Sequence, residues 1–305
     1  MKRILIFASA AIVALASCAK TEVVYKDAPQ EIAFKQITGA MTKTTQNLST
    51  DIKLGVLAFN NADKSEYFGN TLFEHDGNSW SANKYWPVSG KLDFILYAPF
   101  NNTADVVKST YTNAEQKLVI SIDNQVTQTD WLYADKLYAE VEKTNTVINV
   151  NMKHALAKIF VTLKSDLDDV VTIKSFEIIG TNQKSDLTII QNTTSNTVEW
   201  GTMTTKDWLL SELAHDTNKL DKTTGREDEC LVIPGNQTSF KMVYTLEGIA
   251  AEQTYTHTFD SSLNWEAGHK YIYNIVIGVN EITFDCDEVV WEETENPLEW
   301  VASVN

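Results

Sequence analysis

The sequence has little of what most enzymes require. Of its 305 residues only three are cysteines and five are histidines, and the histidines are scattered singly, so no spacing suits a zinc site. It also lacks a G-x-S-x-G nucleophile elbow, an H-E-x-x-H motif and a phosphate-binding glycine loop. We therefore expect no enzymatic activity, no metal and no cofactor.

Positive charge is scarce as well. Asp and Glu number 41 against 25 Lys and Arg, which gives a net charge of −16. Such a chain repels the phosphate backbone of nucleic acids, so we expect no nucleic-acid partner. The acidic clusters fall in polar stretches between strand-like runs, which favours solvated loops over catalytic carboxylates; they are Asp168-Asp169, Glu227-Asp228-Glu229 and Glu292-Glu293.

The remaining reactive side chains are isolated in the sequence. His154 lies at the edge of a predicted strand, where a histidine bonded to a backbone carbonyl is more common than a catalytic base. Cys230 and Cys286 can pair in an exported protein, but each lies in or beside a strand-like run, where a free cysteine acts as a small buried hydrophobe. The sequence leaves that pairing open.

Long apolar runs are confined to the N-terminus. Two basic residues precede an apolar run over residues 4–16, which is too short to span a bilayer but suits a signal peptide. The run ends in Leu15-Ala16-Ser17-Cys18, where small residues lead into a thiol as in the lipobox of bacterial lipoproteins. We expect residues 1–17 to be a lipoprotein signal peptide, and acyl chains on Cys18 to hold the exported protein at the outer membrane.

Beyond a polar tether over residues 18–30, short apolar runs alternate with turn residues to the end of the chain. Aromatic residues make up 10% of the sequence, which favours sheet over helix. The pattern predicts an all-β protein built of β-sandwiches, with one short helix or turn over residues 205–214. The fullest strand-like runs are LGVLAF (54–59), LDFILYA (92–98), AKIFVTL (157–163), IKSFEII (173–179) and YIYNIVIGV (271–279).

The chain is long enough for two such domains. A hydrophilic stretch around residues 140–145 places the break near residue 150. We predict an N-terminal β-sandwich domain over residues 31–150 and a C-terminal one over residues 151–305. No Pro- or Gly-rich linker separates them, which indicates that they pack closely.

Eight tryptophans suggest a second function, in which a surface lipoprotein binds a glycan or a host ligand through exposed aromatic rings. Tryptophan also fills the cores of β-sandwiches, and this use is the more common one. The best candidates for an exposed aromatic surface are Trp80, Tyr85, Trp86, Trp131 and Tyr133.

Several segments in a fixed order resemble the fimbrillin-type pilins of the Bacteroidales, the lipoprotein-derived subunits of type V pili. The lipobox is followed by an early strand and a Thr-rich stretch, EIAFKQITGAMTKTTQ (31–46). Together the segments cover nearly the whole mature chain; the later ones are YWP (85–87), LDFILYAP (92–99), HALAKI (154–159), LVIP (231–234) and WEAGHKYIY (265–273).

The resemblance implies two transthyretin-like β-sandwich domains in tandem, in a structural subunit of a cell-surface fimbria that supports adhesion. In the family a protease removes the first strand, and the vacated groove accepts a strand from the next pilin subunit by β-augmentation. By position, Ile32, Phe34 and Ile37 are the apolar residues of the removable strand. The donor strand would come from the C-terminal region, although a plain terminal strand explains the same residues equally; the candidates are Val289, Val290, Trp291, Leu298, Trp300 and Val301.

One departure from the family concerns the cleavage site. Processing in the family usually follows an arginine just after the first strand, and the arginines here are Arg3 and Arg226. Lys43 occupies the comparable place and is the expected site for a protease that accepts lysine. Without that cleavage the lipid on Cys18 stays, and the protein would be a membrane-held anchor or accessory subunit.

Overall fold

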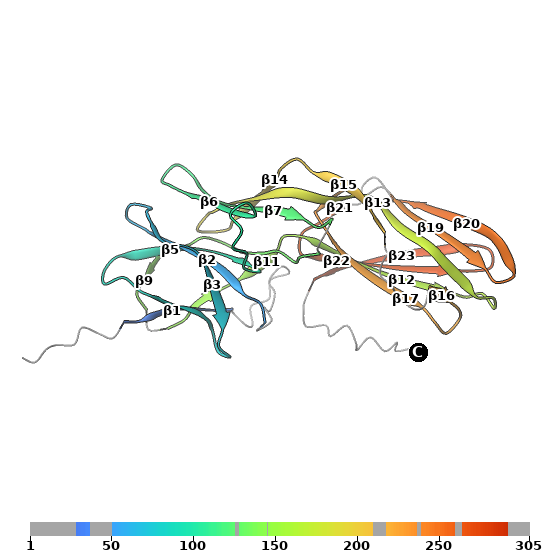
Figure 1. Cartoon of the computed structure of the whole chain (residues 1–305), viewed down its shortest axis with the longest axis horizontal. Coiled ribbons are helices and arrows are strands. Elements are labelled where there is room, and N and C mark those ends of the chain that lie inside the picture. The colour runs from blue at the N-terminus through green and yellow to red at the C-terminus, as the bar shows by residue number, and fades with distance from the viewer. Residues whose placement is uncertain are drawn as a thin grey trace, which may run out of the picture.

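Every regular element that the structure describes is a β-strand, so the all-β prediction is confirmed. The computed structural model describes residues 29–36, 51–125, 128–144, 146–209, 218–236, 239–259 and 264–291. Within these ranges no helix has the length and apolar character needed to cross a membrane. The strands form two bodies that lie end to end along the long axis of the molecule (Figure 1).

The first lobe consists of strands β1 to β11 with β14 and the C-terminal half of β13. The bounds of its own strands are β1 (Glu31–Gln36), β2 (Leu54–Asn60), β3 (Glu66–His75), β4 (Trp80–Tyr85), β5 (Lys91–Ala98), β6 (Val107–Tyr111), β7 (Gln116–Asp123), β8 (Leu132–Ala134), β9 (Tyr138–Glu142), β10 (Ile148–Val150), β11 (Met152–His154) and β14 (Thr197–Trp200).

The second lobe consists of β12, β16 to β23 and the N-terminal half of β13, and β15 lies along the middle of β13. Their bounds are β12 (Ala157–Ser165), β13 (Val171–Ile190), β15 (Thr204–Leu209), β16 (Lys219–Leu220), β17 (Arg226–Val232), β18 (Gly235–Asn236), β19 (Ser239–Leu246), β20 (Ile249–Thr258), β21 (Asn264–Trp265), β22 (His269–Ile277) and β23 (Ile282–Val290).

The main sheet of the first lobe closes on itself. Its strand order is β10-β1-β4-β3-β2-β5-β8-β11, with β9 paired to β5. The strands at the two ends of this order, β10 and β11, are consecutive in the chain and are separated only by Asn151. The sheet therefore returns to the segment from which it started, around a core that includes Phe34, Phe73 and Phe94.

Strands β2 and β5 are buried on both faces, which explains their almost continuous apolar runs. On β2, Leu54, Val56 and Ala58 belong to the core inside the closed sheet. Its alternate residues Leu57 and Phe59 belong to a second core. That second core lies under the sheet made by β6, β7 and the C-terminal half of β13.

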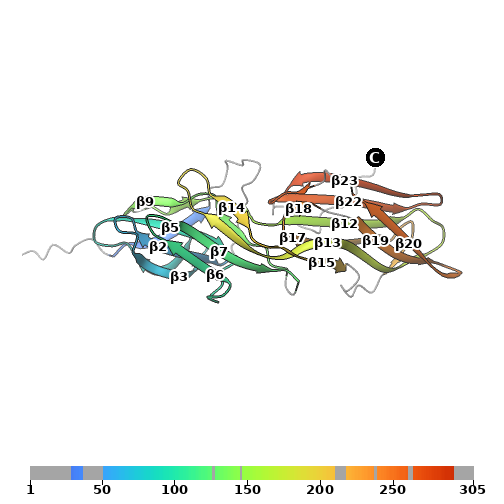
Figure 2. The same ribbon diagram turned by 90° about the horizontal axis from the view of Figure 1, so that it is seen from above.

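The 20-residue strand β13 runs from one lobe into the other (Figure 2). Its residues Val171–Ile179 pair with β19 in the second lobe, and its residues Lys184–Ile190 pair with β7 in the first. Segments on both sides of residue 150 thus share one sheet. The helix or turn expected over residues 205–214 is wrong for residues 205–209, which form β15 because pairing with β13 overrides local preference; residues 210–217 lie outside the described part.

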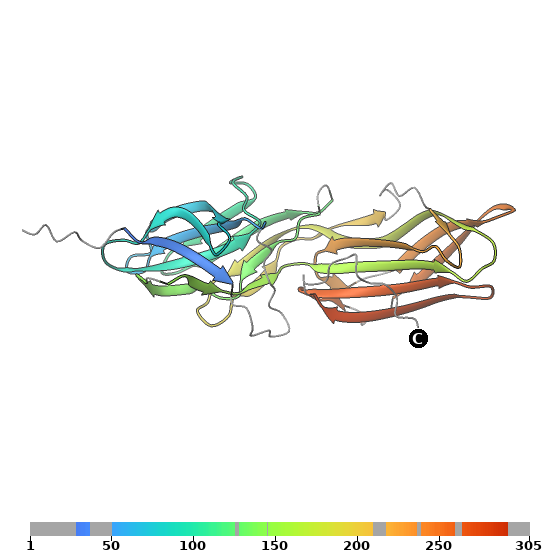
Figure 3. The same cartoon turned by 90° about the horizontal axis from the view of Figure 1, so that it is seen from below.

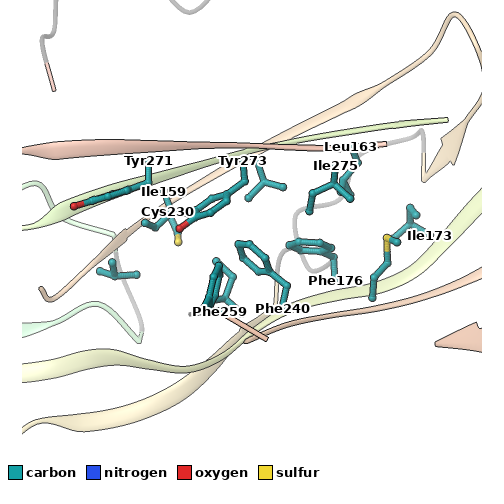
Figure 4. Packing of buried hydrophobic residues seen from close by; sticks show 14 of the residues in the cluster. Ile159, Leu163, Ile173, Phe176, Cys230, Phe240, Phe259, Tyr271, Tyr273 and Ile275 are labelled. Carbon is teal, nitrogen blue, oxygen red and sulfur yellow. The ribbon is translucent and has the colours of Figure 1, made fainter. Parts of the chain in front are cut away.

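The core of the second lobe lies between the sheet β17-β12-β22-β23 and the sheet β20-β19-β13. Figure 4 shows Phe176, Phe240 and Tyr273 meeting at its centre. Cys230 is buried in this core and Cys286 is exposed, and both thiols are free. Their strands are separated by β12 and β22, a span of roughly 14 Å at the usual strand spacing, which is far beyond disulfide reach. Burial raises the pKa of the Cys230 thiol.

The Tyr97 ring lies directly over Gly55 on β2 and leaves no space for a side chain there. A Cβ at Gly55 would stand 2.2 Å from Cε1 of Tyr97, and that ring is fully buried. The Tyr97 hydroxyl is held by the side chain of Asn70 (2.7 Å) and the carbonyl of Asn101 (2.9 Å), so the ring cannot move aside without losing hydrogen bonds.

We predict that Gly55→Ala lowers the free energy of unfolding by about 1–3 kcal/mol, the usual cost of overpacking a core. Urea unfolding followed by tryptophan fluorescence measures the change. Gly201→Ala is the matched control, because its Cβ would meet only ordinary contacts of 3.5 Å or more. Equal losses in the two variants would contradict the packing argument.

Candidate functional site

The site that the fold singles out is the position of β1 in the wall of the first lobe. β1 pairs in parallel with β10, with Phe34 opposite Ile148 and Gln36 opposite Val150. It pairs antiparallel with β4 on its other side, with Phe34 opposite Trp80. Figure 3 shows this short strand lying along the outside of the first lobe. The six residues of β1 therefore fill a slot between β4 and β10.

Alternate side chains of β1 enter the core of the first lobe. Ile32 and Phe34 are fully buried, whereas Glu31 and Lys35 are exposed. The ring of Phe34 meets Phe73 edge-on at 5.5 Å between centroids and Phe94 at 5.3 Å. Two bulky apolar side chains spaced two residues apart are thus what the slot accepts.

Polar contacts fix the beginning of β1. The backbone N–H of Asn83 donates to Oε1 of Glu31 (2.7 Å). The backbone N–H of Trp86 donates to the carbonyl of Gln30 (2.9 Å). These bonds hold the strand in register against the end of β4, so that Ile32 and Phe34 meet their pockets.

Of the residues predicted for a removable strand, Ile32 and Phe34 are described and are buried in the slot. Other predicted site residues fall outside the described ranges: Cys18, Ile37, Lys43, Leu298, Trp300 and Val301. Of the donor candidates that are described, Val289 and Val290 belong to β23, where they pair with Lys270 and His269 of β22. Trp291 follows that strand and is 7% exposed. These three residues are engaged within their own chain.

The candidate aromatic surface does not form from the predicted residues. Trp80, Trp86, Trp131 and Tyr133 are buried, and only Tyr85 is exposed, at 44%. Two of the tryptophans serve the first lobe directly, because Trp80 Nε1 donates to the carbonyl of Ile52 (2.7 Å) and Trp86 meets Phe94 edge-on. Trp80, Trp86 and Trp131 thus act as core residues.

His154 and one of the acidic clusters have structural partners, Asp168-Asp169 lies between strands as expected, and Glu292-Glu293 lies outside the described residues. His154 Nδ1 lies 2.7 Å from Oδ1 of Asp130, so a carboxylate takes the place of the expected backbone carbonyl. Glu227-Asp228-Glu229 lies in β17 and not in a loop, and Asp228 is buried there. Arg226 donates to both oxygens of Asp228, at 2.5 and 3.0 Å, which satisfies the buried charge. Within the described residues, no group of three His, Cys, Asp or Glu side chains is placed to hold a metal.

Sequence reasoning missed the buried carboxylate of Asp93. This residue lies on the outer face of β5 and is fully buried. It accepts hydrogen bonds from Lys64 Nζ (2.8 Å), the backbone N–H of Glu140 (2.8 Å), Asn61 Nδ2 (2.9 Å) and the Tyr111 hydroxyl (2.9 Å). The available signal was a single acid in an otherwise apolar run.

Two opposing effects act on the pKa of Asp93. Burial on its own raises the pKa of the carboxyl, but the hydrogen bonds from Lys64, Glu140, Asn61 and Tyr111 outweigh it and hold the pKa below its ordinary value. Burial, together with the neighbouring Asp93 charge, raises the pKa of Tyr111. The Asp93 carboxylate therefore connects the turn after β2, strand β6 and strand β9 through one ion pair and several hydrogen bonds.

This geometry defines a class of all-β proteins in which the first strand completes a closed sheet. The family model of fimbrillin-like proteins matches residues 38–288. The chain therefore belongs to the fimbrillin-like family. The resemblance seen in the sequence is confirmed.

Solved structures share the fold. The chain is similar to a "putative cell adhesion protein" of Bacteroides uniformis, with 20% identity and a TM-score of 0.59 over 86% of this chain and 99% of that one. It is also similar to a fimbrial protein of Bacteroides vulgatus, with 14% identity and a TM-score of 0.52 over 86% and 99% of the two chains. No curated protein matches the chain.

We predict that Asp93→Asn lowers the free energy of unfolding at pH 7 by about 3 kcal/mol, because it leaves the Lys64 ammonium without its partner. Since the folded pKa of Asp93 is depressed, its contribution is present above the unfolded pKa near 3.8 and is lost as pH falls through the folded value. The difference in the free energy of unfolding between variant and wild type should therefore become smaller below about pH 4.

Urea midpoints at pH 7 and pH 3 measure this difference. Asp169→Asn, at an exposed position, is the control and should change stability little at either pH. If Asp93→Asn lost the same stability relative to the wild type at both pH values, the charged role of Asp93 would be refuted.

Proposed function

We propose that this protein is a structural subunit of a cell-surface fimbria, and that it assembles by strand exchange at the slot of β1. The observation that carries the proposal is that β1 completes a closed sheet while placing Ile32 and Phe34 in its core. Removal of this strand would open the sheet at one position and leave a strand-shaped groove.

An empty slot would be costly in two ways. The N–H and C=O groups that β4 and β10 direct at β1 would lose their partners. The pockets of Ile32 and Phe34 would be exposed, at a cost of roughly 1.5–3 kcal/mol for each side chain. A strand from a second subunit would pair the backbone groups of β4 and β10 again and bury apolar side chains in both pockets. It is therefore the expected occupant of the slot.

The chain supplies the parts that this function needs. The lipobox at Cys18 accounts for export and for a lipid anchor at the outer membrane, and cleavage after Lys43 would leave β1 held only by non-covalent contacts. In this proposal the two lobes are transthyretin-like sandwiches, with β13 contributing to both. Other fimbrial subunits are the partners, and the assembled fimbria supports adhesion.

The donor strand is best placed after Trp291. Val289 and Val290 already pair with β22, whereas Leu298 and Trp300 have the two-residue spacing of Ile32 and Phe34. An alternating strand with bulky residues at this spacing fits the requirements of the slot. The alternative function, ligand binding through exposed aromatics, is not favoured because four of its five candidate residues are buried.

We predict that a chain beginning at Thr44 forms SDS-resistant ladders, whereas the intact chain with Cys18→Ser stays monomeric because β1 fills its own slot. Deletion of residues 292–305 from the Thr44 chain should abolish the ladders. Gel electrophoresis without boiling and analytical ultracentrifugation measure the assembly. A Thr44 chain that stayed monomeric at high concentration would disprove strand exchange.

A peptide of residues 28–37 provides a matched test of the slot. Added in excess to the Thr44 chain, it should block ladder formation by refilling the position of β1. The same peptide with Phe34→Asp should not block assembly, because it would place a charge against Phe73 and Phe94. Equal inhibition by both peptides would exclude the slot as the site of exchange.

A further inference from the structure

Trp291, directly after β23, is held by a ring stack, a backbone hydrogen bond and a lysine above its ring. Its ring lies flat on the imidazole of His154, with centroids 3.7 Å apart and planes 7° from parallel. Its backbone N–H donates to the carbonyl of Gly268 (3.0 Å). Lys158 Nζ lies 5.5 Å from the ring centroid and is itself paired with Glu229 at 2.8 Å. These contacts bury a residue that is the last one described in the chain.

His154 belongs to the other lobe and is itself fixed. It ends β11, where it lies opposite Leu132 of β8 in the closed sheet. Its side chain is 1% exposed, and Asp130 holds Nδ1 at 2.7 Å. The stack therefore joins the end of the last strand of the second lobe to the sheet of the first lobe.

Strand β23 is held mainly by its pairing with β22 and by Phe284, which packs against Phe240 and Tyr273 in the first half of the strand. It is hydrogen-bonded on one side only, to β22, with Val290 opposite His269 at the end that leads to Trp291. Most of its side chains are exposed, including Asp285, Cys286 and Asp287. A pull on the chain beyond Trp291 would load the pair Val290–His269 first and open the hairpin one pair at a time.

We propose that Trp291 is the anchor at which an exchanged C-terminal strand joins the body of its subunit, so that tension passes from Trp291 through His154 into the first lobe. This inference rests on the proposed function, and it assigns Trp291 a positioning role outside the slot. The path is short, because β11, which carries His154, follows β10 after Asn151, and β10 is the strand that pairs with β1.

The anchor can be tested in the monomer, independently of assembly. In the intact chain with Cys18→Ser, Trp291→Ala and His154→Ala should each speed hydrogen exchange of the amides at the Trp291 end of β23 about tenfold or more, since the stack fixes the residue directly beyond that end. Amides of β13 and β19 should keep their wild-type rates. Trp291→Phe preserves an aromatic stack and should restore protection, and Val289→Ala is the control at an exposed position of the same strand.

Unchanged exchange of β23 in both Trp291→Ala and His154→Ala would overturn the anchor. A general loss of protection across the second lobe would overturn it too, because Trp291 would then be a core residue of that lobe. Protection lost in β23 alone, and restored by phenylalanine, supports it.

Ladders of the Thr44 chain test the mechanical role. Trp291→Ala subunits should assemble as the wild type does, because Trp291 does not touch the slot. In single-molecule pulling, β23 should detach from β22 at a lower force in each variant subunit than in the wild type. Identical traces for variant and wild type would refute the anchor. If no wild-type ladders form, strand exchange itself fails, and the exchange rates in the monomer still decide the anchor.

Discussion

Backbone pairing of β1 with β4 on one side and β10 on the other is the constraint on which the first lobe depends. Each of these strands presents one row of hydrogen-bonding groups to β1. Because the described sheet otherwise returns to its own beginning, β1 closes the last gap in its path. The same strand carries Phe34 to Phe73 and Phe94, so pairing and core packing are gained or lost together. Any replacement strand has to meet both demands at once.

Sequence patterns predict strands best where a strand is buried along almost its whole length. The runs LGVLAF and LDFILYA were predicted as strands, and two-sided burial of β2 and β5 explains why they are almost continuously apolar. Asp93 interrupts the second run, and a lone acid there indicates a buried, paired carboxylate. Its partners Lys64 and Tyr111 come from other parts of the chain, so local pattern alone did not identify them.

Features that depend on distant pairing were beyond the sequence. The stretch TKDWLLSELA has the composition of a helix, yet its first half forms β15 because β13 offers a strand to pair with. The tryptophans were open to both surface and core roles, and burial of Trp80, Trp86 and Trp131 decides for the core. The stack of Trp291 on His154 joins residues far apart in the sequence, and no local pattern marks such a contact.

The segment from Ile148 to His154 connects the slot with the anchor. Ile148 lies opposite Phe34 of β1, and His154, at the other end of the segment, receives Trp291. In a row of exchanged subunits, the incoming strand and the root of the outgoing strand would thus act on the same short stretch of one sheet. The second lobe then stands beside the direct path of tension, which passes between Trp291 and β1 without its core. Trp291 also contacts Gly268 and Lys158 of the second lobe, so that lobe supports the root of the strand as well.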